Sequence, residues 1–380
     1  MHPRTRPDLR SRYRRPVDGL SGRQTQRQNL VNARRLLVIP LIVLALASCS
    51  RSEVLTRQYL TFGTLVDVSI ATDDPARAEQ AFDALAADFN QMQTNWNAWK
   101  PGSLLRVNQL LPLGEAFTTS PQIVELITRA QPISRASGYL FNPAIGKLIA
   151  LWGFHQDDPG PTAPDKTDAI RALVAAHPTL DDIEVHGVTL RSRNPDVQLD
   201  FGGFAKGYAL KLASEHLLDL GLRDFIINAG GDLVARGRHL DRPWRIGVRD
   251  PDDEDAVAAI EVRDGEGAFT SGDYERYYME DGQRRHHIID PRTGYPSTGA
   301  RAVTVIHDDP ALADAAATAL TIAHDDEWLA IAQRLGVDKV LRMNASGDVI
   351  MTDAMQQRIS ALRPDLKVTV VHWKSGTSAL

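Results

Sequence analysis

The residue pattern best suited to a metal ion is an aspartate and a threonine four positions apart. The segment Asp314-Ala315-Ala316-Ala317-Thr318 has helical surroundings, so both oxygen-bearing side chains share one helix face, and the alanines allow close packing. A carboxylate with a hydroxyl suits Mg²⁺, which takes few protein ligands and keeps positions for phosphate and water. A buried Asp–Thr hydrogen bond would produce the same spacing, so the pattern alone leaves both interpretations open.

A glycine-rich turn ahead of a helix is the second candidate. The segment Asp200-Phe201-Gly202-Gly203-Phe204-Ala205-Lys206-Gly207-Tyr208 places two glycines between a strand-like run and a helix. Glycine lets backbone approach a ligand closely, and a helix N-terminus favours an anion. The segment matches neither a Walker A loop nor a dinucleotide-binding GxGxxG. A tight turn with a solvated lysine remains the plain alternative.

Two further segments combine glycine, charge and histidine. Asn228-Ala229-Gly230-Gly231-Asp232 is either a ligand-binding turn or an ordinary hairpin, and Thr270–Arg276 is followed by His286–Pro296. Adjacent histidines on a strand point to opposite faces, which makes them a poor metal pair, while one histidine titrating near neutrality is suited to general-base work. Taken alone, the four segments predict a Mg²⁺-assisted site for a phosphorylated ligand.

The elements that would position these segments follow from hydrophobic spacing. Helices are expected over 75–95, around 123–130 until an interruption at Pro132, and over 168–177, 204–221, 310–323 and 325–335. Strands are expected at 65–70, 183–201, 224–229, 233–238, 244–249, 257–263, 275–280, 285–290 and 302–307, with a hairpin at 344–347. Helices grouped around antiparallel strands indicate an α+β fold rather than a doubly wound sheet.

Charge is distributed unevenly along the 380 residues, whose net charge is −5. Residues 1–35 contain ten arginines and two acidic residues, residues 36–48 carry no charge, and the remainder has a net charge of −13. A hydrophobic content of 43% excludes a disordered chain, a single cysteine excludes a disulfide scaffold, and the mild acidity offers no support for a nucleic-acid partner. A basic segment followed by a short apolar one is typical of a secretory signal.

The single cysteine lies at the expected cleavage boundary. Leu46-Ala47-Ser48-Cys49 resembles a bacterial lipobox, in which the cysteine is lipidated and becomes the mature N-terminus. We therefore expect residues 1–48 to be removed, Cys49 to carry a lipid, and residues 49–58 to tether a protein that faces the periplasm of the cell envelope. Inner and outer membrane remain alternatives, as does an ordinary cleaved signal with an incidental cysteine.

From about Phe62 to Ala323, the chain resembles the FAD:protein FMN transferase (ApbE) family. The motifs that carry the resemblance occur in order: Phe62-Gly63-Thr64, Trp99 to Asn108, Phe141-Asn142-Pro143 with Leu151-Trp152-Gly153-Phe154, Asp200 to Tyr208, Asn228 to Asp232, Thr270 to Tyr274, His287 to Pro296, and Asp314 to Thr318. The resemblance implies an α+β domain over 59–360, built as two closely associated subdomains with the FAD site between them. It leaves residues 361–380 as a C-terminal tail.

The family implies a role for particular residues of this chain. Asp314 and Thr318 would bind Mg²⁺ together with the backbone carbonyl of Gly203, and His287 is the candidate that deprotonates the acceptor hydroxyl. The residues expected to contact FAD are Phe62, Trp99, Leu140, Phe141, Asn142, Asp200, Lys206 and Ile288.

The chain departs from the family pattern at several of these positions. Asn142 replaces the usual aspartate, and Phe62 replaces a common methionine. The flavin-stacking aromatic residue is either Trp96 or Trp99 because the motif aligns only with a one-residue shift.

The implied activity is Mg²⁺-dependent transfer of FMN from FAD to a threonine or serine of an extracytoplasmic or membrane redox protein, with release of AMP. Two alternatives remain. One is an FAD pyrophosphatase, in which water replaces the acceptor. The other is a lipid-anchored protein that binds flavin without turnover.

Overall fold

The computed structural model describes residues 53–161, 166–251 and 255–373. The predicted signal peptide, 1–48, and the predicted lipidation at Cys49 lie outside these residues. Among the helices described, none is both long enough and apolar enough to cross a membrane.

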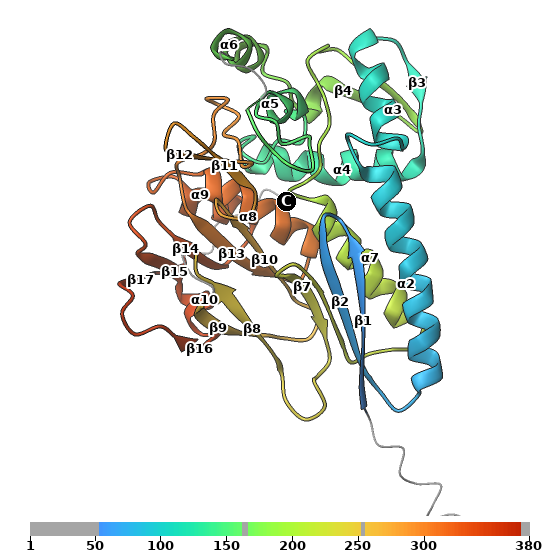
Figure 1. Ribbon diagram of the computed structural model, residues 1–380, viewed down its shortest axis with the longest axis vertical. Coiled ribbons are helices and arrows are strands. Elements are labelled where there is room, and N and C mark those ends of the chain that lie inside the picture. Colours follow the sequence, from blue (N-terminus) through green and yellow to red (C-terminus); the bar gives the residue numbers. More distant parts are fainter. Residues whose placement is uncertain (1–52, 162–165, 252–254, 374–380) are drawn as a thin grey trace, which may run out of the picture. The chain divides into compact units, whose positions relative to one another are not determined.

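A nine-stranded sheet forms the largest element of the fold, in the order β1-β2-β6-β7-β10-β13-β14-β15-β17 (Figure 1). All neighbouring pairs are antiparallel except β15 and β17, which are parallel. The bounds are β1 Glu53–Thr61, β2 Thr64–Thr72, β6 Phe225–Ala229, β7 Asp232–Arg236, β10 Gly267–Gly272, β13 Ala302–His307, β14 Lys339–Met343, β15 Val349–Thr352 and β17 Val368–Val371.

Helices cover one face of this sheet, where α2, α7 and α8 contact its strands. The helices are α2 Pro75–Trp96, α3 Ser103–Leu110, α4 Pro121–Ala136, α5 Gly146–Leu151, α6 Thr167–Ala176, α7 Ala205–Asp219, α8 Pro310–Ile322, α9 Trp328–Leu335 and α10 Asp353–Gln356, with short 3₁₀ turns η1 Leu111–Leu113 and η2 Leu180–Asp182. The opposite face packs against a three-stranded sheet of order β16-β9-β8. Its strands are β8 Trp244–Arg249, β9 Ala256–Val262 and β16 Ile359–Leu362.

Two small sheets complete the fold. The first has the order β3-β5-β4, with β3 Phe117–Thr118, β4 Ile183–His186 and β5 Thr189–Ser192. The second is the β11–β12 hairpin, with β11 Tyr277–Glu280 and β12 Gln283–His286. A separate hydrophobic cluster lies between α5, α6 and Ile289, apart from the core under the large sheet.

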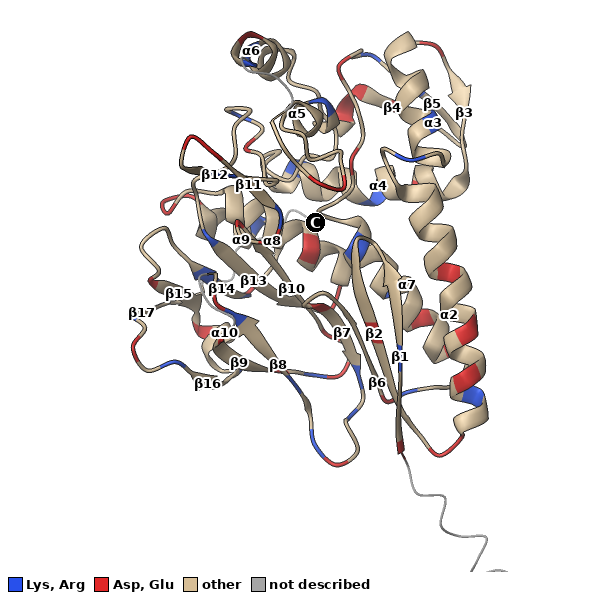
Figure 2. Cartoon of the chain, in the orientation of Figure 1, with Lys and Arg blue, Asp and Glu red and all other residues tan. Residues whose placement is uncertain are grey.

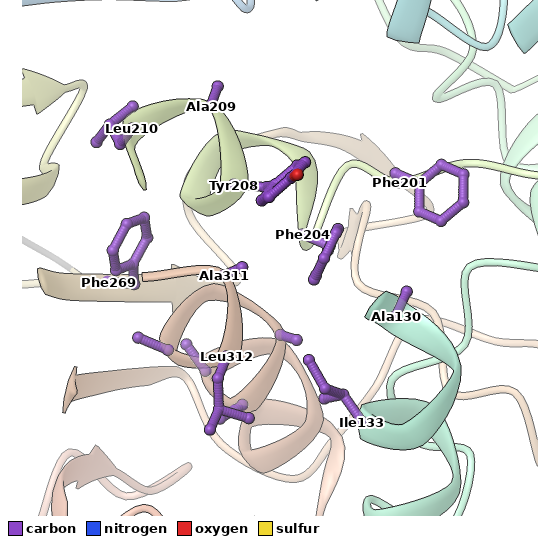
Figure 3. Packing of buried hydrophobic residues seen from close by; sticks show 14 of the residues in the cluster. Ala130, Ile133, Phe201, Phe204, Tyr208, Ala209, Leu210, Phe269, Ala311 and Leu312 are labelled. Carbon is purple, nitrogen blue, oxygen red and sulfur yellow. The ribbon is translucent and has the colours of Figure 1, made fainter. Parts of the chain in front are cut away.

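Aromatic side chains and small residues bring α7 and α8 together. Phe204 and Tyr208 stack at 5.8 Å between ring centroids, and Figure 3 shows Phe204 at the start of α7, on the side that faces α8 and the α4 residues Ala130 and Ile133. Gly207 allows this approach because a β-carbon there would lie 2.3 Å from the Pro310 carbonyl oxygen. The close contact places the first turn of α7 directly against the metal-binding pattern of α8.

Helix α2 forms as the hydrophobic spacing predicts. Asp74 caps its N-terminus, accepting from the Arg77 N–H at 3.1 Å, and Pro75 occupies the first helical position, where no N–H is required. Phe82, Leu85 and Phe89 are buried against the sheet, whereas acidic and basic residues mark the outer side of the helix (Figure 2).

The structure corrects the predicted domain limits. Residues 53–58 of the predicted tether form most of β1, which pairs with β2 along its whole length. The predicted tail contributes to two sheets through the end of β16 and the whole of β17. From Ser52 onward the chain forms one compact unit.

Three element boundaries also differ from the prediction. Helix α4 continues through Pro132 to Ala136, because buried residues on both sides of the proline, including Ala130 and Ile133, hold the helix against the core. The strand predicted over 183–201 ends at Ser192, and the residues that follow form turns. Strand β10 was not predicted, although it carries part of the Thr270–Arg276 segment.

Candidate active site

A buried ion pair joins α7 to the large sheet at the centre of the candidate site. The Lys206 ammonium, in the first turn of α7, donates to Oδ2 of Asp232 at the start of β7. The other Asp232 oxygen accepts the Thr270 N–H of β10 at 2.8 Å. Burial opposes the charged form of Lys206, but the carboxylates of Asp232, Glu275 and Asp314 outweigh it and raise the pKa of the lysine. Lys206 is therefore a fixed positive charge at neutral pH.

Asp314 is on α8, the helix that packs against α7, and is 4% exposed. Its Oδ2 accepts the Gly207 N–H at 2.9 Å. Burial raises the pKa of Asp314 to about 7 and the negative charge of Asp232 adds to this, while Lys206 and the Gly207 N–H act in the opposite direction. The carboxylate is thus held where its own charge is poorly compensated.

Thr318 and Gly203 complete this part of the site. The Thr318 hydroxyl is 3.2 Å from the Ser271 hydroxyl of β10. A β-carbon on Gly203 would lie 2.6 Å from Thr318 Oγ1, so only glycine fits beside this side chain. The structure therefore brings together the three residues predicted as metal ligands, Gly203, Asp314 and Thr318, and their role in binding a metal stays a prediction.

The arrangement fits Mg²⁺ in its chemistry. Oxygen is the ligand atom that Mg²⁺ prefers, and this ion is commonly held by one or two carboxylates plus phosphate oxygens. In a regular helix the Gly207 N–H would donate to the Gly203 carbonyl, but here it donates to Asp314 and leaves that carbonyl available. Within the described residues no group of three or more His, Cys, Asp or Glu side chains forms a self-sufficient metal centre. The site is suited to a metal whose coordination the nucleotide completes.

Trp99 and Asp200 form a second contact beside the glycine turn. The Trp99 indole N–H donates to Asp200 Oδ2 at 2.9 Å, and the Gly202 N–H donates to Oδ1 at 2.8 Å. Trp96 instead stacks on Tyr208 in the core and is 7% exposed. Of the two tryptophans that the sequence leaves open, the half-buried Trp99 is the one beside the candidate site.

Leu140, Phe141 and Asn142 are all buried, so their side chains belong mainly to the core. The Asn142 amide donates to the Pro178 carbonyl at 2.9 Å, and its oxygen accepts the Ala144 N–H at 3.0 Å. Both polar atoms are thus engaged within the protein, and the side chain holds this loop in place. The Asp200 N–H donates to the Pro143 carbonyl at 2.8 Å, which ties the loop to the glycine turn.

Phe62 occupies the two-residue turn between β1 and β2 and has a φ of 52°. Positive φ at both Phe62 and Gly63 is what a hairpin turn of this length requires, although it is uncommon for a bulky residue. Gln93 of α2 holds the turn by accepting the Phe62 N–H and, at 3.2 Å, the Thr61 hydroxyl. Thr64, directly after the turn, approaches Gly230, where a β-carbon would lie 2.3 Å from Thr64 Oγ1.

The two histidines face different partners, as expected for adjacent residues. His286 is buried, with Nε2 3.0 Å from the Ser297 carbonyl. His287 is half-buried, and its Nδ1 donates to the Arg276 carbonyl at 3.3 Å, since a carbonyl can only accept. This tautomer leaves Nε2 as an acceptor.

The pKa of His287 differs from the sequence expectation. Burial, with the nearby His286 and Arg276, lowers it to about 3, so the imidazole does not titrate near neutrality and is uncharged there. Ile288 is buried directly after it, and its carbonyl accepts the Ser297 N–H at 2.9 Å.

Sequence reasoning missed three residues of this region as site residues: Asp232, Ser271 and Glu275. Each belongs to a segment that the sequence marks as a candidate, but within these segments only the glycines and histidines suggested a function. For Asp232 a signal was present, because an acidic residue immediately after Gly230-Gly231 begins a buried strand. Ser271 can be recognised as a site residue only from the structure, in which β10 pairs with β13 beside α8.

The chain has known relatives. Residues 62–341 match the ApbE family. An FAD:protein FMN transferase of Rhodobacter capsulatus is 41% identical over 304 residues, which are 80% of this chain and 58% of that protein. One from Klebsiella pneumoniae is 33% identical over 254 residues, which are 65% of this chain and 72% of the relative.

Solved structures show the same fold. The ApbE protein of Thermotoga maritima superposes with a TM-score of 0.74 and 26% identity, over 81% of this chain and all of that one. The apo form of the Pseudomonas stutzeri flavinyl transferase ApbE gives a TM-score of 0.72 and 28% identity, over 82% and 98% of the two chains. The fold is thus the α+β fold of these flavin transferases. The chain belongs to the ApbE family.

Proposed function

We propose that this protein transfers FMN from FAD to a threonine or serine hydroxyl of an acceptor protein, with Mg²⁺ as cofactor and AMP as the product released. The observation that carries the proposal is the convergence of Lys206, Asp314 and Thr318 on the glycine turn at the start of α7. The ApbE relatives named above, which are FAD:protein FMN transferases, support the same reaction.

The reaction exchanges a phosphoanhydride bond of FAD for a phosphate ester bond to the acceptor. The acceptor oxygen forms a bond to the phosphorus of the FMN half, the bond from that phosphorus to the bridging pyrophosphate oxygen breaks, and AMP leaves with that oxygen. Such transfers depend mainly on positioning and on charge neutralisation. Lys206 supplies a permanent positive charge, and the exposed Gly202 with the half-buried Gly203 lets the phosphates reach the helix N-terminus.

Asp314, Thr318 and the Gly203 carbonyl would hold Mg²⁺. When bound, this ion neutralises the negative charge that builds up on the phosphate oxygens. Ser271, within hydrogen-bond distance of Thr318 Oγ1, orients that hydroxyl. A cation here also compensates the buried Asp314 carboxylate, whose raised pKa shows that the protein alone does not.

His287 accepts the proton of the attacking hydroxyl through Nε2, since Nδ1 is engaged with the Arg276 carbonyl. The imidazole is uncharged at physiological pH, and its lowered pKa makes it a weaker base than an ordinary histidine. Trp99, fixed by Asp200, provides the aromatic surface beside the turn on which a flavin or adenine ring stacks.

The proposed setting is the cell envelope. Cys49 carries the lipid, residues 1–48 form the signal that is removed, and the acceptor is an extracytoplasmic or membrane redox protein. The support for this setting is the basic and apolar leader with the chain's single cysteine at its end.

AMP release separates this proposal from its alternatives. The full chain is incubated with FAD and Mg²⁺, with and without a purified redox-protein domain whose native form carries a threonine-linked FMN, here in its unmodified form. AMP formed only with the domain supports transfer. Equal AMP release without the domain identifies a pyrophosphatase, and bound FAD with no AMP in either sample identifies a flavin-binding protein.

A further inference from the structure

The outer face of the β1–β2 hairpin changes character along its length. Successive side chains of a strand point to opposite faces. On one face Tyr59 reaches α2, where its hydroxyl donates to the Phe82 carbonyl at 2.7 Å. The other face carries four cross-strand pairs: Val54 with Ala71, Thr56 with Ser69, Gln58 with Asp67, and Leu60 with Leu65.

Only the last of these pairs is both apolar and exposed, because Val54 and Ala71 are half-buried. The Thr56 and Ser69 hydroxyls hydrogen-bond at 2.8 Å, as suits a surface in contact with water. At the tip, by contrast, Leu60 is 82% exposed and Leu65 is 52% exposed. No charged residue occurs between Arg57 and Asp67. The exposed apolar surface is therefore confined to the end of the hairpin, which we call the Leu60–Leu65 pair.

This end of the hairpin is continuous with the candidate active site. The Leu65 carbonyl accepts the Gly230 N–H at 3.1 Å, and Thr64 lies against Gly230. Gly230-Gly231 leads directly into Asp232, the partner of Lys206. The turn residue between the two leucines is Phe62, one of the residues expected to contact FAD.

We propose that the Leu60–Leu65 pair is the docking point for the acceptor protein, which places an apolar side chain there beside its threonine or serine. This inference rests on the proposed function, because a group transfer between proteins requires the acceptor to reach the site across its rim. Leucine side chains standing in water gain free energy when a partner covers them. Placing them at the tip, with polar pairs behind, fixes the end of the hairpin that the partner contacts.

The chain offers a matched control for this surface. Leu113, in η1 and away from the hairpin, is 65% exposed, a value between those of Leu60 and Leu65, so it matches either hairpin leucine taken singly. Isolated exposed leucines of this kind are ordinary on protein surfaces. A docking role predicts an effect at the hairpin and none at Leu113.

The test compares the full-length wild type, the double variant Leu60→Ser with Leu65→Ser, and the control Leu113→Ser. FAD binding in the presence of Mg²⁺ is measured by flavin fluorescence, and transfer is measured as kcat/KM for the unmodified redox-protein domain. We expect unchanged FAD affinity, a fall of about tenfold in kcat/KM through KM in the double variant, and no change in the control.

Several outcomes overturn the docking role. Unchanged kcat/KM shows that the leucines do not contact the acceptor, and a parallel loss of FAD affinity assigns them to the nucleotide site. A wild-type dimer that the double variant abolishes, or wild-type binding to phosphatidylcholine vesicles that the double variant abolishes, assigns the pair to another occupant. If the wild type binds FAD but transfers nothing to the domain, the proposed function itself fails and the docking role with it.

Discussion

Two buried ion pairs in this protein show how a structural pair differs from a functional one. Arg358 and Glu266 bind side by side, with Nη1 to Oε2 at 2.8 Å and Nη2 to Oε1 at 2.5 Å, and their side chains are 6% and 12% exposed. Lys206 also pairs with one buried carboxylate, Asp232, but the charges of the buried Asp314 and the exposed Glu275 act on it as well. The first pair is bidentate, and a second cation, Lys339, lies 3.9 Å from Glu266, whereas the second pair has an excess of negative charge.

The difference indicates what each pair is for. A bidentate buried pair ties elements together, and here it joins the segment before β16 to the residue before β10. An excess of carboxylates beside a glycine turn is costly without a counterion. That excess is explained if a metal ion and a nucleotide bind there. Mutations at the two sites should therefore have different effects. A change among the carboxylates around Lys206 should lower activity, and a change in the Arg358–Glu266 pair should lower stability.

The largest effect is expected for Asp314→Asn. Removing the carboxylate removes a metal ligand, so kcat/KM for Mg²⁺-dependent AMP release should fall about 100-fold or more. The midpoint of thermal unfolding without Mg²⁺ should stay the same or rise, because burial opposes the charge of Asp314. Asp308→Asn is the matched control, since this side chain lies just before α8 and is 83% exposed. Full Mg²⁺-dependent activity in Asp314→Asn would contradict the metal assignment.

Arg358→Met should have the opposite effect and lower stability while activity is kept. Leaving Glu266 buried without its bidentate partner should lower the free energy of unfolding by about 3 kcal/mol. The kcat/KM of the folded fraction should be unchanged because Arg358 does not contact the site. Urea unfolding followed by circular dichroism measures the loss. If Arg358→Met keeps its stability but loses turnover, the structural role of the Arg358–Glu266 pair is contradicted.

Stability should depend on pH through Asp314. Its pKa in the folded protein is about 7, above the value near 4 of an unfolded chain, so folding favours the protonated form. This contribution is fully present below about pH 4 and is lost as the pH rises through about 7. Mg²⁺ should restore stability at pH 8 more than at pH 5, since it competes with the proton. The pH-dependent loss should be absent from Asp314→Asn, and an unchanged pH profile in that variant would assign it to another group.

Gly203→Ala should act on metal binding. Its β-carbon would lie 2.6 Å from Thr318 Oγ1, so the hydroxyl must move. We expect the Mg²⁺ concentration for half-maximal activity to rise about tenfold. Gly160→Ala is the control, because no atom lies within 4 Å of the β-carbon it would add. Equal Mg²⁺ requirements in the two variants would remove Gly203 from the site.

The smallest effects are expected for substitutions of the two tryptophans. Trp99→Phe loses the hydrogen bond to Asp200 and should weaken FAD binding about fivefold. Trp96→Phe alters only the stack on Tyr208, so it should lower the unfolding midpoint and leave FAD affinity unchanged. Fluorescence titration with FAD and thermal unfolding give both values. The reverse pattern would make Trp96 the flavin-binding aromatic residue.

Much of the fold could be predicted because its helices follow a simple pattern. In α2 the apolar spacing and the cap at Asp74 agree with the final structure, and the helix predicted over 310–323 is α8, although its cap at Asp309 was not predicted. Strand β1 was predicted as a tether because Arg57 and Gln58 look solvated. In fact Arg57 forms ion pairs with Glu79 and with Asp83 of α2, and its guanidinium lies over the Phe82 ring. Partners supplied by a distant helix cannot be read from the strand itself.

The candidate site could be predicted as four segments but not as a geometry. Asp314 and Thr318 are adjacent on one helix turn, so their proximity follows from spacing. Their contact with Gly203 and the burial of Asp232 depend on how α7 packs on α8 and β7. The lowered pKa of His287 likewise arises from neighbours brought by other elements, including Arg276. Such long-range packing is what sequence spacing alone does not contain.

The most direct test of the account is the intact mass of the acceptor. The unmodified redox-protein domain is incubated with FAD, Mg²⁺ and either wild type, Asp314→Asn or Arg358→Met, and its mass is then measured. The account predicts a gain of one FMN on a single threonine or serine with wild type and with Arg358→Met, and no gain with Asp314→Asn. No gain with wild type, or an equal gain with Asp314→Asn, would contradict it.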